Sequence, residues 1–287
     1  MTRPTRPFRT TRPRIAGPAG PAGTTGTAPR PVRRTARART AAVAGAAAVL
    51  VAGLSGCGAS AADDRHPERR SFALAGSTLT VDSDDTALEI VAAAGRPSGK
   101  IQVTRWFQGR VAIGSDPEVT WSMKDDRLVL RLKCSGIVAD CAARHRVEVP
   151  RGIAVKVDND TGSVRASGFR HPLTIRSGDG SVRVTDTSGP VDLRTGDGSL
   201  RAEVASRTVR TRSGDGSVHV TLSTVPDRVE SRSGDGSLTI ELPRAAYRVD
   251  TRTGDGAERV SVPRDDASAH LVTARTGDGS LTVRTVN

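Results

Sequence analysis

The strongest constraint on this chain is a five-residue tag, Arg-(Ser/Thr)-Gly-Asp-Gly, that occurs six times after residue 175. A degenerate seventh copy ends at Gly162, and the last glycines of the seven copies are spaced by 18, 18, 18, 20, 20 and 23 residues. A repeat of about 20 residues is typical of stacked architectures, in which each unit buries its apolar side chains against the next. The tag therefore predicts a repeat fold that offers a surface rather than a catalytic pocket. The tags centre on Asp179, Asp197, Asp215, Asp235, Asp255 and Asp278.

Each repeat predicts two short strands joined by the tag. In residues 190–207, Val191 and Leu193 alternate with polar residues before the tag, and Leu200 and Val204 do so after it. Alternation with a period of two indicates half-buried strands. The glycines beside the aspartate are expected to supply the positive φ of a sharp reversal.

The tag could close an antiparallel hairpin or form a corner between two facing sheets. The corner agrees better with the sequence, because the apolar positions lie at the same distance from the tag in every unit. Stacking the units then places equivalent residues side by side in parallel ladders. A strand of about five residues is about 17 Å long, so one unit cannot bury its own core. We therefore expect an all-β fold, a parallel β-solenoid of about seven regular coils over residues 158–287, with two or three faces. Insertions fall only in the other connection, at 223–227, 243–247 and 263–270.

Residues 72–157 alternate less regularly and contain most of the aromatic residues of the expected folded part. We expect irregular β-strands or early coils that cap the solenoid, because an open sheet edge invites pairing with another chain. Cys134 and Cys141, with six residues between them, are interpreted as a disulfide of an exported protein. A metal site is the alternative, but two cysteines with only His145 nearby fall short of the usual four ligands.

The net charge of +12 comes from the N-terminal leader. Residues 1–57 contain ten arginines and no acidic residue, which leaves 33 basic against 31 acidic residues in the rest of the chain. The basic balance is therefore not a nucleic-acid signal. The repeats also lack the interleaved basic and aromatic residues that nucleic-acid binding needs, so no such partner is expected.

An apolar run from Ala41 to Leu54 has the length of a signal-peptide core and is short for a membrane span. It ends in Leu54-Ser55-Gly56-Cys57, which resembles the lipobox of bacterial lipoproteins. The resemblance implies a signal peptide over 1–56, cleavage before Cys57 and a diacylglycerol on its sulfur; a plain secretory peptide is the alternative. Residues 57–71 would be the lipidated cysteine and a polar tether, which places the domain at the extracytoplasmic face of the cell membrane.

The tag aspartates should form a column with neighbours about 4.8 Å apart. Because stacked carboxylates repel, we expect an interleaved ladder with the arginine three residues before each aspartate, and backbone N–H groups that cap each turn. The alternative is Ca²⁺ between coils, as in calcium-binding β-rolls, although their nine-residue frame is absent and calcium needs about six to eight oxygens. We expect structural turns, no metal and no cofactor. The arginines are Arg176, Arg194, Arg212, Arg232, Arg252 and Arg275.

No catalytic motif stands out. The five histidines are dispersed and are interpreted as surface residues, with His219 at an outward position. The thin aliphatic core leaves little room for a small-molecule substrate. The rival hypothesis is a carbohydrate-active enzyme on a β-helix, similar to polysaccharide lyases and hydrolases, which would need a groove with convergent carboxylates. The outward acids to consider are Asp192, Glu203, Glu230, Glu241 and Asp250.

Residues 72–287, behind the lipobox, resemble a known family. The resemblance is most specific in the tags, from Ser177-Gly178-Asp179-Gly180-Ser181 through Thr276-Gly277-Asp278-Gly279-Ser280. The family's members, the DUF4097-like proteins, are bacterial surface proteins of unknown function that are called adhesins. The resemblance implies a non-enzymatic adhesion, scaffold or envelope-sensing module, here in a lipoprotein version. Its partners would be the membrane, through the lipid anchor, and an envelope protein or glycan. The adhesin name rests on architecture and not on an identified ligand.

Overall fold

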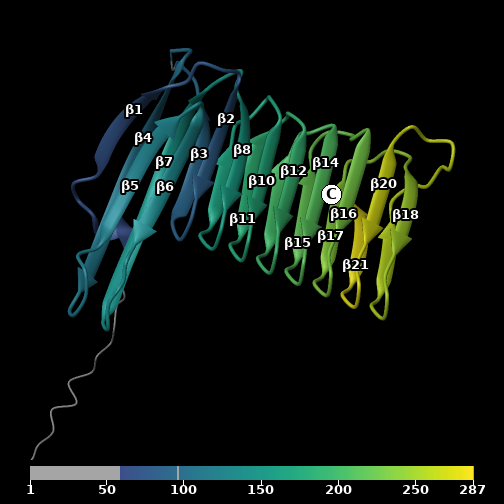
Figure 1. The fold of residues 1–287 in the computed structure, drawn as a ribbon. Helices are drawn as coiled ribbons and strands as arrows, with labels where there is room; N and C mark the ends of the chain where they lie inside the picture. The colour runs from purple at the N-terminus through teal and green to yellow at the C-terminus, as the bar shows by residue number, and fades with distance from the viewer. Residues whose placement is uncertain (1–58, 96, 287) are drawn as a thin grey trace, which may run out of the picture. The chain divides into compact units, whose positions relative to one another are not determined.

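The computed structural model describes residues 59–95 and 97–286, all within one compact unit, so Cys57 lies outside the described residues. This part of the chain consists of an 11-stranded sheet (sheet A) and a 10-stranded sheet (sheet B), shown in Figure 1. The one helical segment described is a 3₁₀ turn, Ala61–Asp63. No helix in the described part has the length and apolar character that crossing a bilayer requires.

Neighbouring strands within each sheet are rarely consecutive in the chain. In spatial order, sheet A contains β1 (Glu68–Ala73), β4 (Lys100–Val111), β7 (Ala139–Pro150), β3 (Ala87–Ala93), β9 (Val164–Ser167), β11 (Val182–Thr187), β13 (Leu200–Val204), β15 (Val218–Leu222), β17 (Leu238–Leu242), β21 (Leu281–Thr285) and β19 (Glu258–Ser261). Sheet B contains β5 (Glu118–Lys124), β6 (Arg127–Lys133), β2 (Thr78–Ser83), β8 (Ala154–Asn159), β10 (Leu173–Ser177), β12 (Val191–Thr195), β14 (Thr208–Ser213), β16 (Arg228–Arg232), β20 (Leu271–Arg275) and β18 (Arg248–Arg252).

Each regular coil contributes one strand to sheet B and the next strand to sheet A, with the tag turn between them. The strands pair in parallel with a constant register, so that Leu173, Val191 and Val209 are direct partners in sheet B. The predicted all-β parallel β-solenoid is confirmed, and it has two faces. The two sheets do not close on each other.

The core is a layer of small aliphatic side chains between the sheets. One row of sheet A, which we call the inward row, is 2% exposed or less at each of its seven aliphatic positions. Because each coil buries this row against its neighbours only, the stability of one coil depends on the stack. The aliphatic members of the inward row are Leu88, Val164, Val182, Leu200, Val218, Leu238 and Leu281.

The coils do not stack in chain order at either end. The last coil of the chain, β20–β21, lies between β16–β17 and β18–β19 (Figure 1). At the other end, the coil β2–β3 lies between β6–β7 and β8–β9. The long loop at 263–270 allows the C-terminal exchange. Tyr247 N donates to Pro263 O at 3.0 Å, which links this loop to the connection before β18. The sequence pattern does not predict the exchange, because all coils have the same register.

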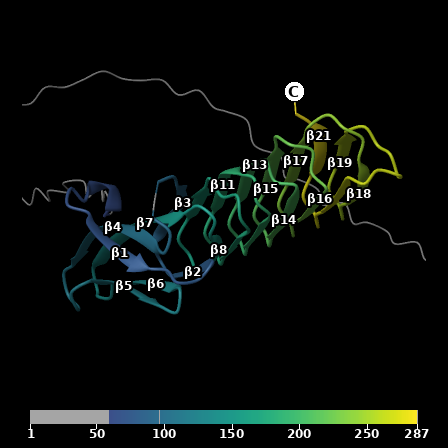
Figure 2. The ribbon, with the colours of Figure 1, turned by 90° about the horizontal axis from the view of Figure 1, so that it is seen from above.

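Antiparallel strands end the parallel stack at its N-terminal side (Figure 2). Strands β1, β4 and β7 pair antiparallel in sheet A, and β5 and β6 form a hairpin in sheet B. The hairpin turn places Asp125 and Asp126 at φ values of 48° and 57°. Aspartate tolerates this left-handed conformation better than most residues do, which suits the turn.

The described part of the expected tether, from residue 59 onward, lies against β4 and β7. Ala59 N donates to the Asp140 carboxylate at 2.6 Å, and Phe107 N donates to that of Asp64 at 3.0 Å. This bond from Phe107, together with one from His66, lowers the pKa of Asp64 below its ordinary value. The polar composition of the segment predicted a tether. The residues that hold it, Phe107 and Asp140, are distant in sequence, so local composition gave no sign of them.

Candidate binding surfaces

The tag glycines are required by the close approach of stacked turns. A Cβ atom on Gly198 would lie 2.2 Å from Gly180 O, and one on Gly216 would lie 2.1 Å from Gly198 O. Side-chain carbons do not come that close to a carbonyl oxygen, so only glycine fits. No glycine of the six tags has a positive φ. The expectation that these glycines adopt a left-handed conformation is therefore wrong. Glycine is needed because the backbones of stacked turns lie too close together for a side chain.

In five of the six tags, the Ser or Thr hydroxyl donates a hydrogen bond to a backbone carbonyl of a neighbouring coil. Thr195 Oγ1 donates to Gly178 O at 3.2 Å and to Gly180 O at 3.1 Å, both in the preceding coil. The sequence analysis did not predict these hydrogen bonds, although the restriction of the second tag position to Ser or Thr was a signal for them. The same kind of bond is made by Ser213, Ser233, Thr253 and Thr276.

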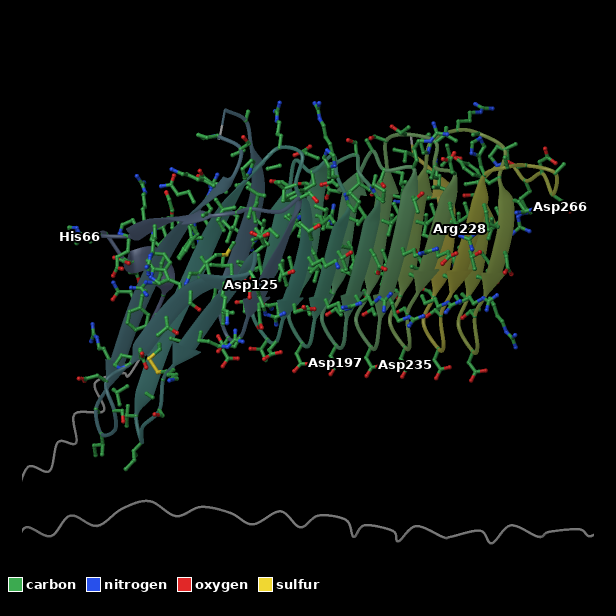
Figure 3. The ribbon with its side chains drawn as sticks, turned by 45° about the horizontal axis from the view of Figure 1, so that its top comes forward. His66, Asp125, Asp197, Arg228, Asp235 and Asp266 are labelled. Atoms are coloured by element: carbon green, nitrogen blue, oxygen red, sulfur yellow. A yellow bond between two sulfur atoms is a disulfide. The ribbon has the colours of Figure 1, made fainter. Side chains whose placement is uncertain are left out.

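The tag aspartates form a column at the turn tips and point away from the sheets, as Asp197 and Asp235 show in Figure 3. The expected interleaved ladder with the tag arginines is wrong. Arg194 pairs instead with Asp192 at 3.1 Å, and Arg275 pairs with Asp250 at 3.2 Å. The reason is geometric, because the arginines extend over the face of sheet B while the aspartates project beyond its edge.

The six tag arginines form a continuous row on the outer face of sheet B, which we call the arginine stripe. They are direct partners on adjacent strands and all are exposed. At a strand spacing of about 4.8 Å, six positions extend over about 24 Å. In spatial order the stripe consists of Arg176, Arg194, Arg212, Arg232, Arg275 and Arg252.

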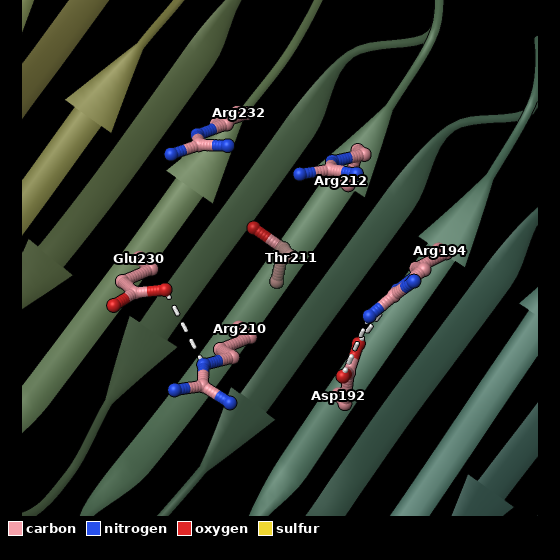
Figure 4. Close-up of a pocket in the computed structure, with 7 residues that line it drawn as sticks. All are labelled: Asp192, Arg194, Arg210, Thr211, Arg212, Glu230 and Arg232. Atoms are coloured by element: carbon pink, nitrogen blue, oxygen red, sulfur yellow. Dashed lines mark hydrogen bonds and ion pairs between the residues drawn. The ribbon is translucent and has the colours of Figure 1, made fainter.

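The centre of the stripe is a shallow depression of about 60 Å³, shown in Figure 4. Arg210 beside it pairs with Glu230 at 3.3 Å. Within the part of the chain that the structure describes, Arg212 and Arg232 have no carboxylate partner, and their charges lie on adjacent strands. Like charges in direct register destabilise a sheet, so an anion bound here would relieve repulsion. Guanidinium groups suit phosphate and carboxylate oxygens, which they can bind through two parallel hydrogen bonds.

The outer face of sheet A carries a broad, open depression of about 620 Å³ that includes Asp186, Glu203 and Glu241. Hydrogen bonding from Arg201, 2.6 Å away, lowers the pKa of Glu203. The pKa of Glu241 is lowered to about 2, chiefly by hydrogen bonding from Arg284. A glycosidase acid needs a raised pKa, so these two carboxylates are suited to pairing with cations and not to donating a proton at neutral pH.

Two histidines differ in their surroundings. His145 is fully buried, with Nδ1 3.3 Å from Thr86 Oγ1 and with Nε2 unpartnered among the described atoms. Burial, helped by the charge of Arg105, lowers the pKa of His145 to about 4. The surface interpretation is therefore wrong for His145, although its alternation with Val147 could have placed it inside. His219 does point outward, 3.2 Å from the Glu241 carboxylate.

Cys134 and Cys141 are joined by a disulfide, with 6.2 Å between their Cα atoms. Cys57, the expected lipidation site, lies outside the described residues. In residues 59–95 and 97–286, no group of three or more His, Cys, Asp or Glu side chains is arranged to hold a metal ion.

Residues 146–287 match the family model described as Toastrack DUF4097. This part of the chain is a Toastrack domain. The resemblance to the DUF4097-like proteins is thus confirmed, and the Toastrack match covers all of the tag repeats.

Solved structures with low sequence identity resemble the chain. A "putative adhesin" from Bacteroides fragilis NCTC 9343 has 12% identity and a TM-score of 0.47, and covers 76% of this chain and 97% of its own. One from Parabacteroides merdae ATCC 43184 has 11% identity and a TM-score of 0.42, with coverage of 77% and 96%. A "putative lipid binding protein" from Parabacteroides distasonis ATCC 8503 has 11% identity and a TM-score of 0.35, with coverage of 78% and 98%. No curated protein matches the sequence.

Proposed function

We propose that this protein is a lipid-anchored, non-enzymatic binding module at the extracytoplasmic face of the membrane, and that the arginine stripe binds an anionic polymer of the cell envelope. The observation that carries the proposal is the register of the stripe. Six guanidinium groups repeat at a constant strand spacing. A flexible polymer with repeated phosphate or carboxylate groups can contact several of them at once, so weak contacts add up.

The direction of approach follows from the two charged columns. The tag aspartates project beyond one edge of sheet B, and an anionic chain would be repelled there. The face of sheet B keeps a net positive charge over its central strands, where Arg210 and Arg228 share the single carboxylate of Glu230 beside the stripe. A polyanion would therefore lie on the face and follow the stacking direction, away from the aspartate column.

The carbohydrate-active enzyme is the weaker hypothesis. It would require an acid with a raised pKa near a second carboxylate, whereas Glu203 and Glu241 both have lowered pKa values and cationic partners. The open surface they share lacks the enclosed shape that would exclude water from a reaction. Their arrangement supports a binding face and not a hydrolytic site.

The test is retention of the chain from residue 57 onward on immobilised envelope polymers rich in phosphate or carboxylate. The double variant Arg212→Gln/Arg232→Gln removes two guanidiniums that have no carboxylate partner, so the fold should remain intact. Arg165→Gln/Arg259→Gln removes the same charge from exposed positions of sheet A and is the matched control. Equal binding by the two double variants would exclude the stripe as the binding surface.

A further inference from the structure

The ribbon formed by β4 and β7 extends beyond the sheet and ends in exposed apolar side chains. Pairing continues past the strands, with Ala112 N donating to Val138 O at 2.9 Å and Ile137 N donating to Ile113 O at 2.8 Å. Ile113, Ile137 and Val138 are 62%, 78% and 62% exposed, and we call these three residues the apolar tip. Among the described residues, the one other large apolar side chain exposed in this way is Val286, at 40%.

The apolar tip is held in place by covalent and backbone links. The disulfide between Cys134 and Cys141 closes the loop that carries Ile137 and Val138 (Figure 3). The loop is thus restrained from folding back to bury these side chains. Three exposed apolar side chains on one restrained loop pair form a candidate interaction site.

The chain enters the described structure beside this tip. Ala59 N donates to Asp140 Oδ2 at 2.6 Å, and Asp140 is two residues from Val138, or about 7 Å along the ribbon. Cys57 precedes Ala59 by two residues, so at most about 7 Å of chain separates them. A lipid on Cys57 would therefore enter the bilayer close to the apolar tip.

We propose that the apolar tip inserts into the surface of the bilayer that holds the lipid of Cys57. This inference rests on the lipid anchor of the proposed function. Once the anchor holds the domain, a weak apolar contact becomes an intramolecular one with a high effective concentration. Isoleucine and valine side chains gain from leaving water at the interface. The second contact would set the direction in which the solenoid stands on the membrane.

The experiment separates the tip from the lipid. The chain from residue 57 onward, made without lipid by Cys57→Ser, is sedimented with vesicles of phosphatidylethanolamine and phosphatidylglycerol. We expect it to partition onto the vesicles. The triple variant I113S/I137S/V138S should partition at least roughly tenfold more weakly, and Val286→Ser, the matched control, should bind as the parent does. An unchanged thermal midpoint shows that the triple variant is folded.

A second measurement uses the lipidated chain. Hydrogen exchange at 111–118 and 134–140 should slow when the lipidated protein is reconstituted into the same vesicles, compared with detergent micelles. Absence of both vesicle partitioning and slowed exchange would overturn the tip inference, even if mass spectrometry finds the lipid on Cys57. If native Cys57 carries no lipid but the apolar tip still binds vesicles, the proposed lipid anchor is wrong and membrane binding by the tip is supported. A triple variant that loses self-association rather than vesicle binding would also overturn the inference.

Discussion

Glu258 accepts a hydrogen bond of 2.6 Å from Thr251 Oγ1, across the end coil of the solenoid. By register, Glu258 continues the inward row and is the direct partner of Leu281. It belongs to the Asp255 copy of the tag, the one that continues Ala257-Glu258 instead of Ser and an aliphatic residue. The exchange of the last two coils makes this irregular copy the end of the stack. A charged residue at an inward position is a known way to protect an open edge.

Glu258→Leu should therefore promote end-to-end association, because it completes an aliphatic surface on the edge strands β18 and β19. Analytical ultracentrifugation should show a higher average mass than for the parent at the same concentration. Glu258→Gln keeps the polar end and is the control. An unchanged mass for Glu258→Leu would mean that Glu258 does not protect the edge.

Gly198→Ala should destabilise the stack by about 1 to 3 kcal/mol, because the new Cβ would press on Gly180 O at 2.2 Å and must displace a coil. Gly95→Ala is the comparison, since Gly95 has a φ of +76° but no atom within 4 Å of the added carbon. It should cost about 1 kcal/mol from strain alone. Urea unfolding of both variants distinguishes contact from strain, and a smaller loss for Gly198→Ala would refute the contact explanation.

Thr195→Val should cost about 1 kcal/mol or more, because it removes the hydroxyl that bonds to the preceding coil while the shape is kept. Asp197→Asn should cost much less, since this exposed carboxylate has no partner among the described residues. Chemical denaturation of the two variants gives the comparison. A larger effect at Asp197 would restore the aspartate column as a structural element.

The stability of the protein should fall as the pH drops from about 6.5 to about 4, because of His145. The pKa of His145 is lowered from 6.5 to about 4, so in this range the unfolded state binds a proton that the folded state does not. The contribution is fully present above pH 6.5, and up to roughly 3 kcal/mol is lost by pH 4. His145→Leu extends the aliphatic row and should flatten the slope of stability against pH between 4 and 6.5. An identical slope in the variant would show that His145 is not the cause.

The repeat fold was predictable from the sequence because each coil repeats one register, and the alternation around Val191 and Leu200 fixes which side chains are inside. The exchange of coils at the two ends was not predictable, because a coil can pair with either candidate neighbour in the same register and with the same hydrogen bonds. The aspartate column was foreseen, but its pairing with arginine was not, because their separation depends on the shape of the turn. The apolar tip was missed since Ile113 and Ile137 are brought together only by the pairing of β4 and β7.

The most direct test of the account is the affinity of the mature chain for an anionic envelope polymer at physiological salt. We predict measurable binding that weakens with salt. It should fall at least about fivefold in Arg212→Gln/Arg232→Gln and be unchanged in Arg165→Gln/Arg259→Gln. Binding that is absent, or that both double variants weaken equally, would contradict the assignment of the arginine stripe as the binding surface.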